Sequence, residues 1–195
     1  MTIPIHWLAN RNPKLPTCAY LACLLLTFAP VPCSGANLKK QLDVQKQLYG
    51  AMADGRQVDL YTLTNANGIE VCVMTLGATL TTVKAPDRDG NVAVITLHKK
   101  SFAEYSKGHP LLGSVVGRFA NRIADAKFTI DGVTHQVAKN AGKHHIHGGG
   151  RKDGFAWQVW QGQPIRDEQA VGVRLTLVSP DGQAGFPGRL ETAVT

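Results

Sequence analysis

Histidines gather in one short stretch of this 195-residue chain. Three of its seven histidines, His144, His145 and His147, lie within four positions, and Gly148 follows with two more glycines. On an extended backbone alternate side chains point to the same side, so we expect His145 and His147 to face one way and His144 the other. Because glycines carry no side chain, this stretch predicts a place where a ligand can approach the backbone closely.

The residue types in this stretch allow three interpretations. The stretch can be a polar loop with solvated histidines. It can be a metal site with two or three imidazole ligands, but such a site needs a further ligand, and no suitably spaced Asp, Glu or Cys is evident. In the third interpretation a histidine moves a proton or hydrogen-bonds a polar ligand, since an imidazole with an unperturbed pKa of about 6.5 titrates near neutral pH.

A second candidate cluster covers residues 113–123 and holds Arg118 and Arg122, four residues apart, with Asn121 beside the second arginine. The planar fork of donors on Arg122 suits vicinal hydroxyls or a carboxylate. The alternative is a structural arginine paired to a carboxylate. The glycines here are not spaced as a dinucleotide-binding motif, and the glycines after His147 do not form a phosphate-binding loop. A third cluster, residues 179–188, predicts a tight pair of turns with an architectural role.

The elements that must position these residues are predicted to be strands. Asp131-Gly132 lies between two apolar, β-branched runs and is a strong hairpin signal. The polar stretch 37–48 is expected to be a linker or a short helix. From about residue 49 to 195 we predict an all-β sandwich or barrel. The expected strands cover residues 58–63, 69–74, 78–83, 92–97, 128–130, 133–137, 156–160, 171–178 and 189–195.

Residues 1–36 have the pattern of a signal peptide. Arg11 and Lys14 precede an apolar run over 18–29, and small residues follow at 34–36. A buried element of the domain is the alternative, and a lipid anchor on Cys33 is conceivable although the residues before it fit poorly. We expect export to the periplasm or the medium. Cleavage after residue 36 leaves Cys72 as the single cysteine, so the mature chain cannot form an internal disulfide.

Composition excludes several classes of protein. With 44% apolar and 18% charged residues, the chain is suited to a packed core and not to disorder. No apolar stretch reaches the roughly 18–20 residues that span a bilayer, so we expect no membrane partner after removal of residues 1–36. The formal charge of +7 falls to +5 without the two basic residues of that leader. The remaining basic residues are scattered, so we expect no nucleic-acid partner.

Several motifs follow one another along the chain at plausible spacing. In order they are Pro86-Asp87-Arg88-Asp89-Gly90, Gly117-Arg118-Phe119-Ala120-Asn121-Arg122-Ile123-Ala124, Phe128-Thr129-Ile130-Asp131-Gly132, His145-Ile146-His147-Gly148-Gly149, Gly154-Phe155-Ala156-Trp157, Ser179-Pro180-Asp181-Gly182 and Gly185-Phe186-Pro187-Gly188. Taken in this order, they resemble the N-terminal half of the aldose 1-epimerase (galactose mutarotase) family. The resemblance extends from about Tyr49 to Thr195 and is specific because so many motifs match in one order.

The resemblance implies an antiparallel β-sandwich of the galactose-mutarotase type, incomplete at the C-terminus. It also implies interconversion of the α and β anomers of a free aldose such as galactose or glucose. That reaction uses acid–base chemistry and implies no metal or nucleotide cofactor. By motif, Arg122 and Asn121 are the expected substrate-binding residues. His147 is the expected catalytic residue, which hydrogen-bonds near the ring oxygen and assists proton transfer.

The chain also departs from the family pattern. The family's principal acid is a second histidine on a later segment and its base is a glutamate near the C-terminus, and we expect both to be missing from this chain. The sequence ends within an expected strand, which suggests the N-terminal part of a longer product. A non-catalytic sugar-binding β-sandwich is therefore the alternative function, and a histidine-loop metal binder is a third.

Overall fold

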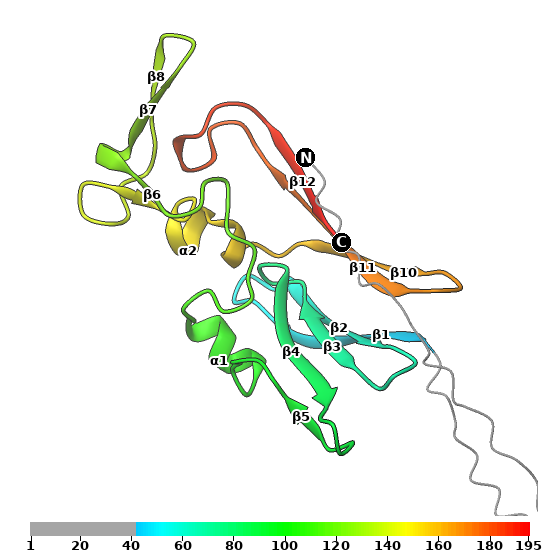
Figure 1. Ribbon diagram of the computed structural model, residues 1–195. Coiled ribbons are helices and arrows are strands. Elements are labelled where there is room, and N and C mark those ends of the chain that lie inside the picture. Colours follow the sequence, from blue (N-terminus) through cyan, green and yellow to red (C-terminus); the bar gives the residue numbers. More distant parts are fainter. Residues whose placement is uncertain (1–41) are drawn as a thin grey trace, which may run out of the picture.

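The computed structural model describes residues 42–195, so the expected signal peptide over 1–36 lies outside the described residues. The largest layer is an antiparallel sheet in which consecutive strands are neighbours (Figure 1). Strands of this sheet carry β-branched and aromatic residues whose alternate side chains can pack on both faces. Its members are β1 (Asp43–Ala51), β2 (Gln57–Thr64), β3 (Glu70–Met74), β4 (Thr79–Pro86) and β5 (Val92–Val94).

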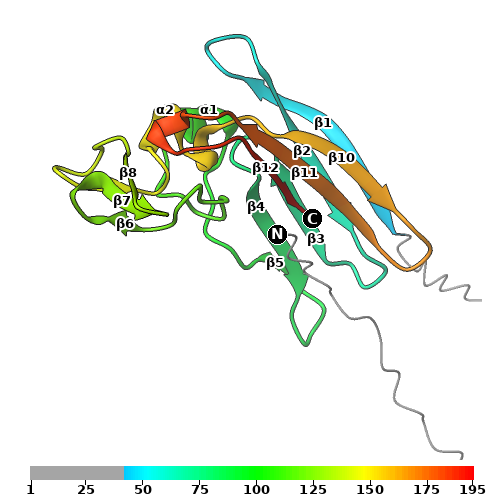
Figure 2. The ribbon, with the colours of Figure 1, turned by 90° about the horizontal axis from the view of Figure 1, so that it is seen from above.

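A second antiparallel sheet packs against the first, and the two together form the expected all-β sandwich. Its strands, in order, are β10 (Gln161–Arg166), β11 (Val171–Ser179) and β12 (Leu190–Val194). Figure 2 shows β10 and β11 lying over β1 and β2. Tyr61 of β2 is fully buried between the layers, and its hydroxyl donates a hydrogen bond to the carbonyl oxygen of Gly162 in β10 at 2.8 Å. The prediction of an all-β sandwich is confirmed.

Two apolar clusters lie on opposite faces of the larger sheet. The cluster between the sheets includes Tyr61, Trp160 and Leu175. On the other face, Val58 and Met74 pack with Tyr105 of the short helix α1 (Phe102–Lys107). The larger sheet is therefore buried on both faces near its centre, which fixes its register because a slip by one residue would exchange the two sets of side chains.

A lobe at one end of the sandwich holds the candidate residues (Figure 1). It is built from two short antiparallel pairs and a third apolar cluster that includes Ile123, Val137 and Phe186. The pairs are β6 (Arg122–Ile123) with β9 (His145–Ile146), and β7 (Lys127–Ile130) with β8 (Val133–Gln136). Short helical segments complete the chain path: η1 (Ala124–Ala126), α2 (Gly150–Asp153), η2 (Phe155–Trp157) and η3 (Gln183–Gly185).

Several expectations about the elements are confirmed. The turn Asp131-Gly132 joins β7 to β8, with positive φ angles of 49° and 78° that suit a tight hairpin turn. Strands also form where they were expected over most of 58–63, 69–74, 78–83, 171–178 and 189–195.

Three expectations are corrected by the structure. Residues 43–48 belong to strand β1 and not to a linker or short helix, because pairing with β2 outweighs their polar composition. The run 156–160 begins in η2, and Trp160 donates its backbone N–H to the carbonyl of Thr75 outside any named strand. The run 92–97 forms only the three-residue strand β5. Among the described residues, no helix has the length and apolar character needed to cross a membrane.

Candidate functional site

The short strand pair β6–β9 brings the predicted site residues together. Arg122 lies opposite Ile146 in this pair, so Asn121 and His147 meet at its end. The backbone N–H of His147 donates to the carbonyl oxygen of Asn121, and the backbone N–H of Asn121 donates to Nδ1 of the His147 ring, both at 3.0 Å. Nη1 of Arg122 lies 3.4 Å from Oδ1 of Asn121. Residues 26 positions apart thus form one polar group, which we call the Asn121–Arg122–His147 triad.

The hydrogen bond from Asn121 defines the chemistry that His147 offers. Because Nδ1 accepts a hydrogen bond from the backbone N–H of Asn121, the neutral ring carries its own proton on Nε2. Nε2–H is therefore a donor available to a ligand oxygen. The ring is only half-buried, so a ligand can reach it from solvent. A doubly protonated ring would place a second donor against the Asn121 N–H and lose this contact.

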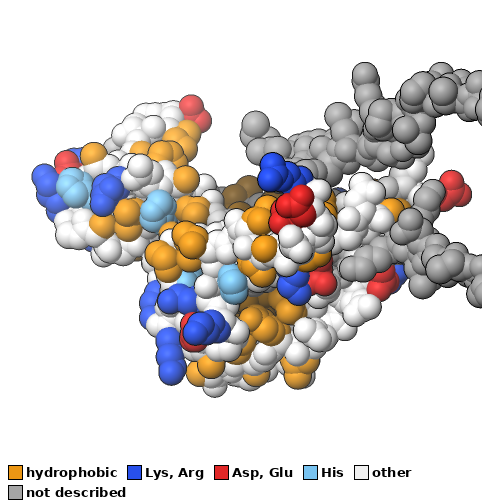
Figure 3. Space-filling view, turned by 60° about the horizontal axis from the view of Figure 1, so that its bottom comes forward, with side chains coloured by type: hydrophobic (Ala, Val, Ile, Leu, Met, Phe, Trp, Pro, Cys, Tyr) orange, Lys and Arg blue, Asp and Glu red, His pale blue; other side chains and the backbone are white. Residues whose placement is uncertain are grey.

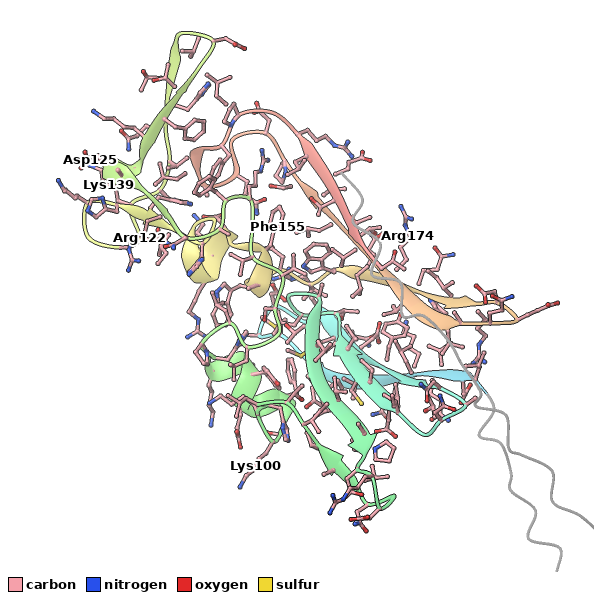
Figure 4. The ribbon with its side chains drawn as sticks, in the orientation of Figure 1. Lys100, Arg122, Asp125, Lys139, Phe155 and Arg174 are labelled. Carbon is pink, nitrogen blue, oxygen red and sulfur yellow. The ribbon has the colours of Figure 1, made fainter. Side chains whose placement is uncertain are left out.

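Arg122 is exposed and keeps most of its donors available for a ligand. Its single side-chain hydrogen bond among the described residues is the one to Asn121, and it forms no ion pair within residues 42–195. Figure 4 shows Arg122 on the end lobe, well separated from Lys100 and Arg174 on the sandwich. A planar cation with unused N–H groups next to an amide is suited to hydrogen-bonding neighbouring hydroxyls.

Backbone strain marks the same place. Asn121 and His147 both have positive φ angles, 62° and 51°, a region that residues other than glycine seldom adopt. The reciprocal hydrogen bonds between these two residues hold them there. Strained backbone of this kind is typical of positions where a side chain must point in a set direction.

Asn140, for which the sequence predicted no role, positions strand β9. Its side-chain amide donates to the carbonyl of Ile146 at 2.8 Å and accepts from the N–H of Ile146 at 2.7 Å. This pair of bonds replaces a missing strand partner for β9. The only signal in the sequence was that Asn140 lies four residues before His144.

The three clustered histidines have three different environments. His144 lies beside η1, and its Nδ1 accepts a hydrogen bond from the N–H of Asp125 at 3.1 Å. The Lys143 ammonium lies 3.0 Å from the Asp125 carboxylate and lowers the pKa of that group. His145 is fully buried, with Nδ1 at 2.7 Å from the carbonyl of Ala138 and its ring edge-on to Phe186.

The prediction that the side chains of His145 and His147 point to the same side is thus wrong. His147 has a positive φ and is not part of the strand, so the alternation of side chains ends before it. His145 belongs to the core of the lobe, and His147 belongs to the polar triad. Within the described part of the chain, no group of three or more His, Cys, Asp and Glu side chains could hold a metal ion.

The glycines after His147 also differ from expectation. They were expected to leave room for a ligand, but the protein's own backbone occupies the space at Gly148. A Cβ added there would lie 1.5 Å from the carbonyl oxygen of Gly117. Gly148 therefore allows the segment that carries Arg118 and Arg122 to pack directly against the segment that carries His147.

Comparison with known proteins places this geometry in context. Residues 59–195 match the family model described as aldose 1-epimerase. The galactose mutarotase of Sus scrofa is 34% identical over 79% of this chain and 43% of its own length. The aldose 1-epimerase of Escherichia coli K12 is 38% identical over 72% of this chain and 39% of its own length.

A solved structure also matches. The galactose 1-epimerase of Lactobacillus acidophilus NCFM superposes with a TM-score of 0.69 at 33% identity, covering 78% of this chain and 43% of the other. The chain thus spans less than half the length of the relatives it matches.

Proposed function

This chain belongs to the aldose 1-epimerase family, and on that basis we propose that the protein interconverts the α and β anomers of a free aldose, with galactose and glucose as the candidate substrates. The observation that carries the proposal is the Asn121–Arg122–His147 triad. It combines an oriented imidazole donor with an exposed guanidinium fork, held by reciprocal backbone bonds.

The triad suits the chemistry of a cyclic sugar. Ring opening requires a base that takes the proton of the anomeric hydroxyl and an acid that protonates the ring oxygen. The C1–C2 bond then rotates, and the ring closes on the other face of the aldehyde. In this proposal Nε2–H of His147 hydrogen-bonds near the ring oxygen and assists proton transfer there. The guanidinium of Arg122 and the amide of Asn121 hydrogen-bond hydroxyl groups of the sugar. The sugar therefore keeps its position relative to His147 while its ring opens.

Turnover needs more than the triad. The resemblance to the family implies a second histidine as the principal acid and a glutamate as the base, and the triad contains neither. The proposal therefore gives the described residues the binding and orienting part of the reaction. The partner is a monosaccharide, and the signal-like residues 1–36 support action on sugars in the periplasm or outside the cell. Cell fractionation that finds the protein only in the cytoplasm would contradict this location.

A specific observation favours the alternative of a sugar-binding protein without catalysis. Among the described residues, no carboxylate hydrogen-bonds the ring of His147, and the nearby Asp125 is held by Lys143. The triad then binds the sugar but has no base to open it. Sugar binding that depends on His147, without any anomerisation, would support this alternative.

The deciding experiment follows freshly dissolved α-D-galactose by NMR, with residues 37–195 and the His147→Ala variant. His98→Ala is the matched control, because His98 is exposed and lies on the sandwich, away from the triad. A rate above that of buffer, lost in His147→Ala and kept in His98→Ala, supports catalysis by this chain. A buffer rate with galactose binding that needs His147 supports the binding alternative. If galactose neither binds nor anomerises, both proposals are wrong.

A further inference from the structure

The other arginine of the same motif, Arg118, uses all of its donors within the protein. Nε donates to Oγ of Ser179 at 2.8 Å. Nη1 donates to the carbonyls of Pro187 and Gly188 at 3.1 and 2.7 Å, and Nη2 donates to the carbonyls of Ser179 and Pro180 at 3.0 and 2.6 Å. A guanidinium has five N–H donors, so none remains for a ligand. Arg118 therefore differs in kind from Arg122, although the two lie four residues apart.

The acceptors of Arg118 all belong to the turn over residues 179–188, which is itself firmly packed. Ser179 is fully buried and also bonds Gln183. The N–H of Ala138 donates to the carbonyl of Ala184 at 2.8 Å, and Phe186 lies in the apolar cluster of the lobe. Arg118 thus joins its own segment to a fixed part of the lobe.

The segment that Arg118 holds leads directly to the triad. Gly117 packs its backbone against Gly148, next to His147, and its carbonyl accepts from the N–H of Phe155 at 3.2 Å. Three residues after Arg118, the backbone of Asn121 accepts a hydrogen bond from the N–H of His147 and donates one to Nδ1 of the His147 ring. The position of Asn121, and with it the orientation of the His147 ring, depends on where this segment is fastened.

We propose that Arg118 is a positioning residue of the sugar site: it fastens residues 117–122 to the turn over 179–188 and so holds Asn121 against Nδ1 of His147. This inference rests on the proposed function for the identity of the ligand. The role of Arg118 in orienting the His147 ring does not depend on that function, because the hydrogen-bond state of the ring can be measured without a ligand. The motif Gly117-Arg118 and the turn over 179–188 are not part of the triad. In this proposal both serve to position it.

The test compares the wild-type protein with Arg118→Lys, which keeps the charge but loses the planar fork. Ser179→Ala is the second variant, because it removes the acceptor of Nε and leaves the four carbonyl contacts in place. Arg174→Lys is the matched control: Arg174 is exposed in β11 and lies far from Arg122 in Figure 4. The measurements are the ¹⁵N signals of the His147 ring, galactose affinity by NMR titration, and the melting temperature.

We expect the wild-type ring to show an accepting Nδ1 and a protonated Nε2. In Arg118→Lys we expect a mixture of ring states and about a tenfold loss of galactose affinity at a temperature well below melting. Ser179→Ala should show the same changes to a smaller extent, and Arg174→Lys should match the wild type.

The proposal is overturned if Arg118→Lys keeps the wild-type ring signals and affinity, even with a lower melting temperature, because that result describes a purely structural residue. If Arg118→Lys does not fold, the ring signals of Ser179→Ala decide. If the wild type binds no galactose, that result counts against the proposed function, and the His147 ring signals still decide the role of Arg118.

Discussion

At the scale of the residue, a side chain's function here depends on how many of its polar atoms the protein already uses. Arg118 has every donor occupied, whereas Arg122 has nearly all of its donors available. His109 is the opposite extreme, a polar ring without partners. It is 9% exposed, and neither ring nitrogen has a hydrogen-bond partner among the described residues. Its ring packs between Tyr105 and Trp157.

The environment of His109 predicts sensitivity to acid. Burial lowers the pKa of His109 below its ordinary value of 6.5, and the charges of Lys99 and Arg151 lower it further. Below pH 6.5 the His109 imidazole is protonated in the unfolded chain but stays neutral in the folded chain until the pH reaches its lower folded-state pKa. The free energy of unfolding therefore falls as the pH falls from 6.5 toward that folded-state pKa. His109→Gln should flatten this dependence, measured by chemical denaturation between neutral and mildly acidic pH.

The control is His98→Gln, which removes an exposed imidazole by the same substitution. It should retain the acid sensitivity of the wild type. Equal pH dependence in His109→Gln and the wild type would show that His109 is not the group responsible.

At the scale of the element, the site depends on two backbone segments that touch without side chains between them. Gly148 and Gly117 make this contact, and it brings β6 and β9 close enough to pair. Strand pairs as short as two residues have little intrinsic stability. Their geometry therefore comes from close packing, from the Asn140 amide and from the third apolar cluster.

Gly148→Ala tests this contact. Gly148 and Gly132 have the same φ of 78°, but a Cβ at Gly132 meets no atom within 4 Å, whereas a Cβ at Gly148 meets the Gly117 carbonyl. Gly132→Ala therefore carries the backbone strain alone and is the matched control. We expect Gly148→Ala to lose at least about 2 kcal/mol more unfolding free energy than Gly132→Ala, together with galactose binding. Equal losses in denaturant titrations would show that the close approach is unimportant.

At the scale of the whole molecule, the described residues leave apolar side chains exposed. Leu97 and Ile95 are 80% and 67% exposed just after β5, and Leu48 is 61% exposed on β1. Figure 3 shows apolar side chains gathered on one face of the molecule among basic groups. The sheet also ends in edge strands, β1 and β5, which can pair with other chains.

We therefore expect residues 37–195 to self-associate as concentration rises, measured by sedimentation velocity. Replacing Ile95 and Leu97 with lysine should reduce the association without lowering the melting temperature, because both side chains are exposed. Lys99→Ala, a change at a neighbouring polar position, is the control and should associate like the wild type. A wild-type chain that stays monomeric and unfolds cooperatively at all concentrations would contradict this expectation.

In the sequence by itself, the order of the motifs indicated the family by resemblance. Alternation and turn residues determined the all-β architecture, most strand positions and the Asp131-Gly132 hairpin, because both act over short distances. The sequence also pointed to Asn121, Arg122 and His147 through motifs, and their roles remain predictions. Only the tertiary structure decided which of the two arginines has its N–H donors used within the protein and which of the three histidines is buried. It also decided that residues 43–48 pair as a strand. Those properties depend on contacts between residues far apart in the chain, such as Arg118 with Gly188 and Asn121 with His147, and local patterns carry no information about such contacts.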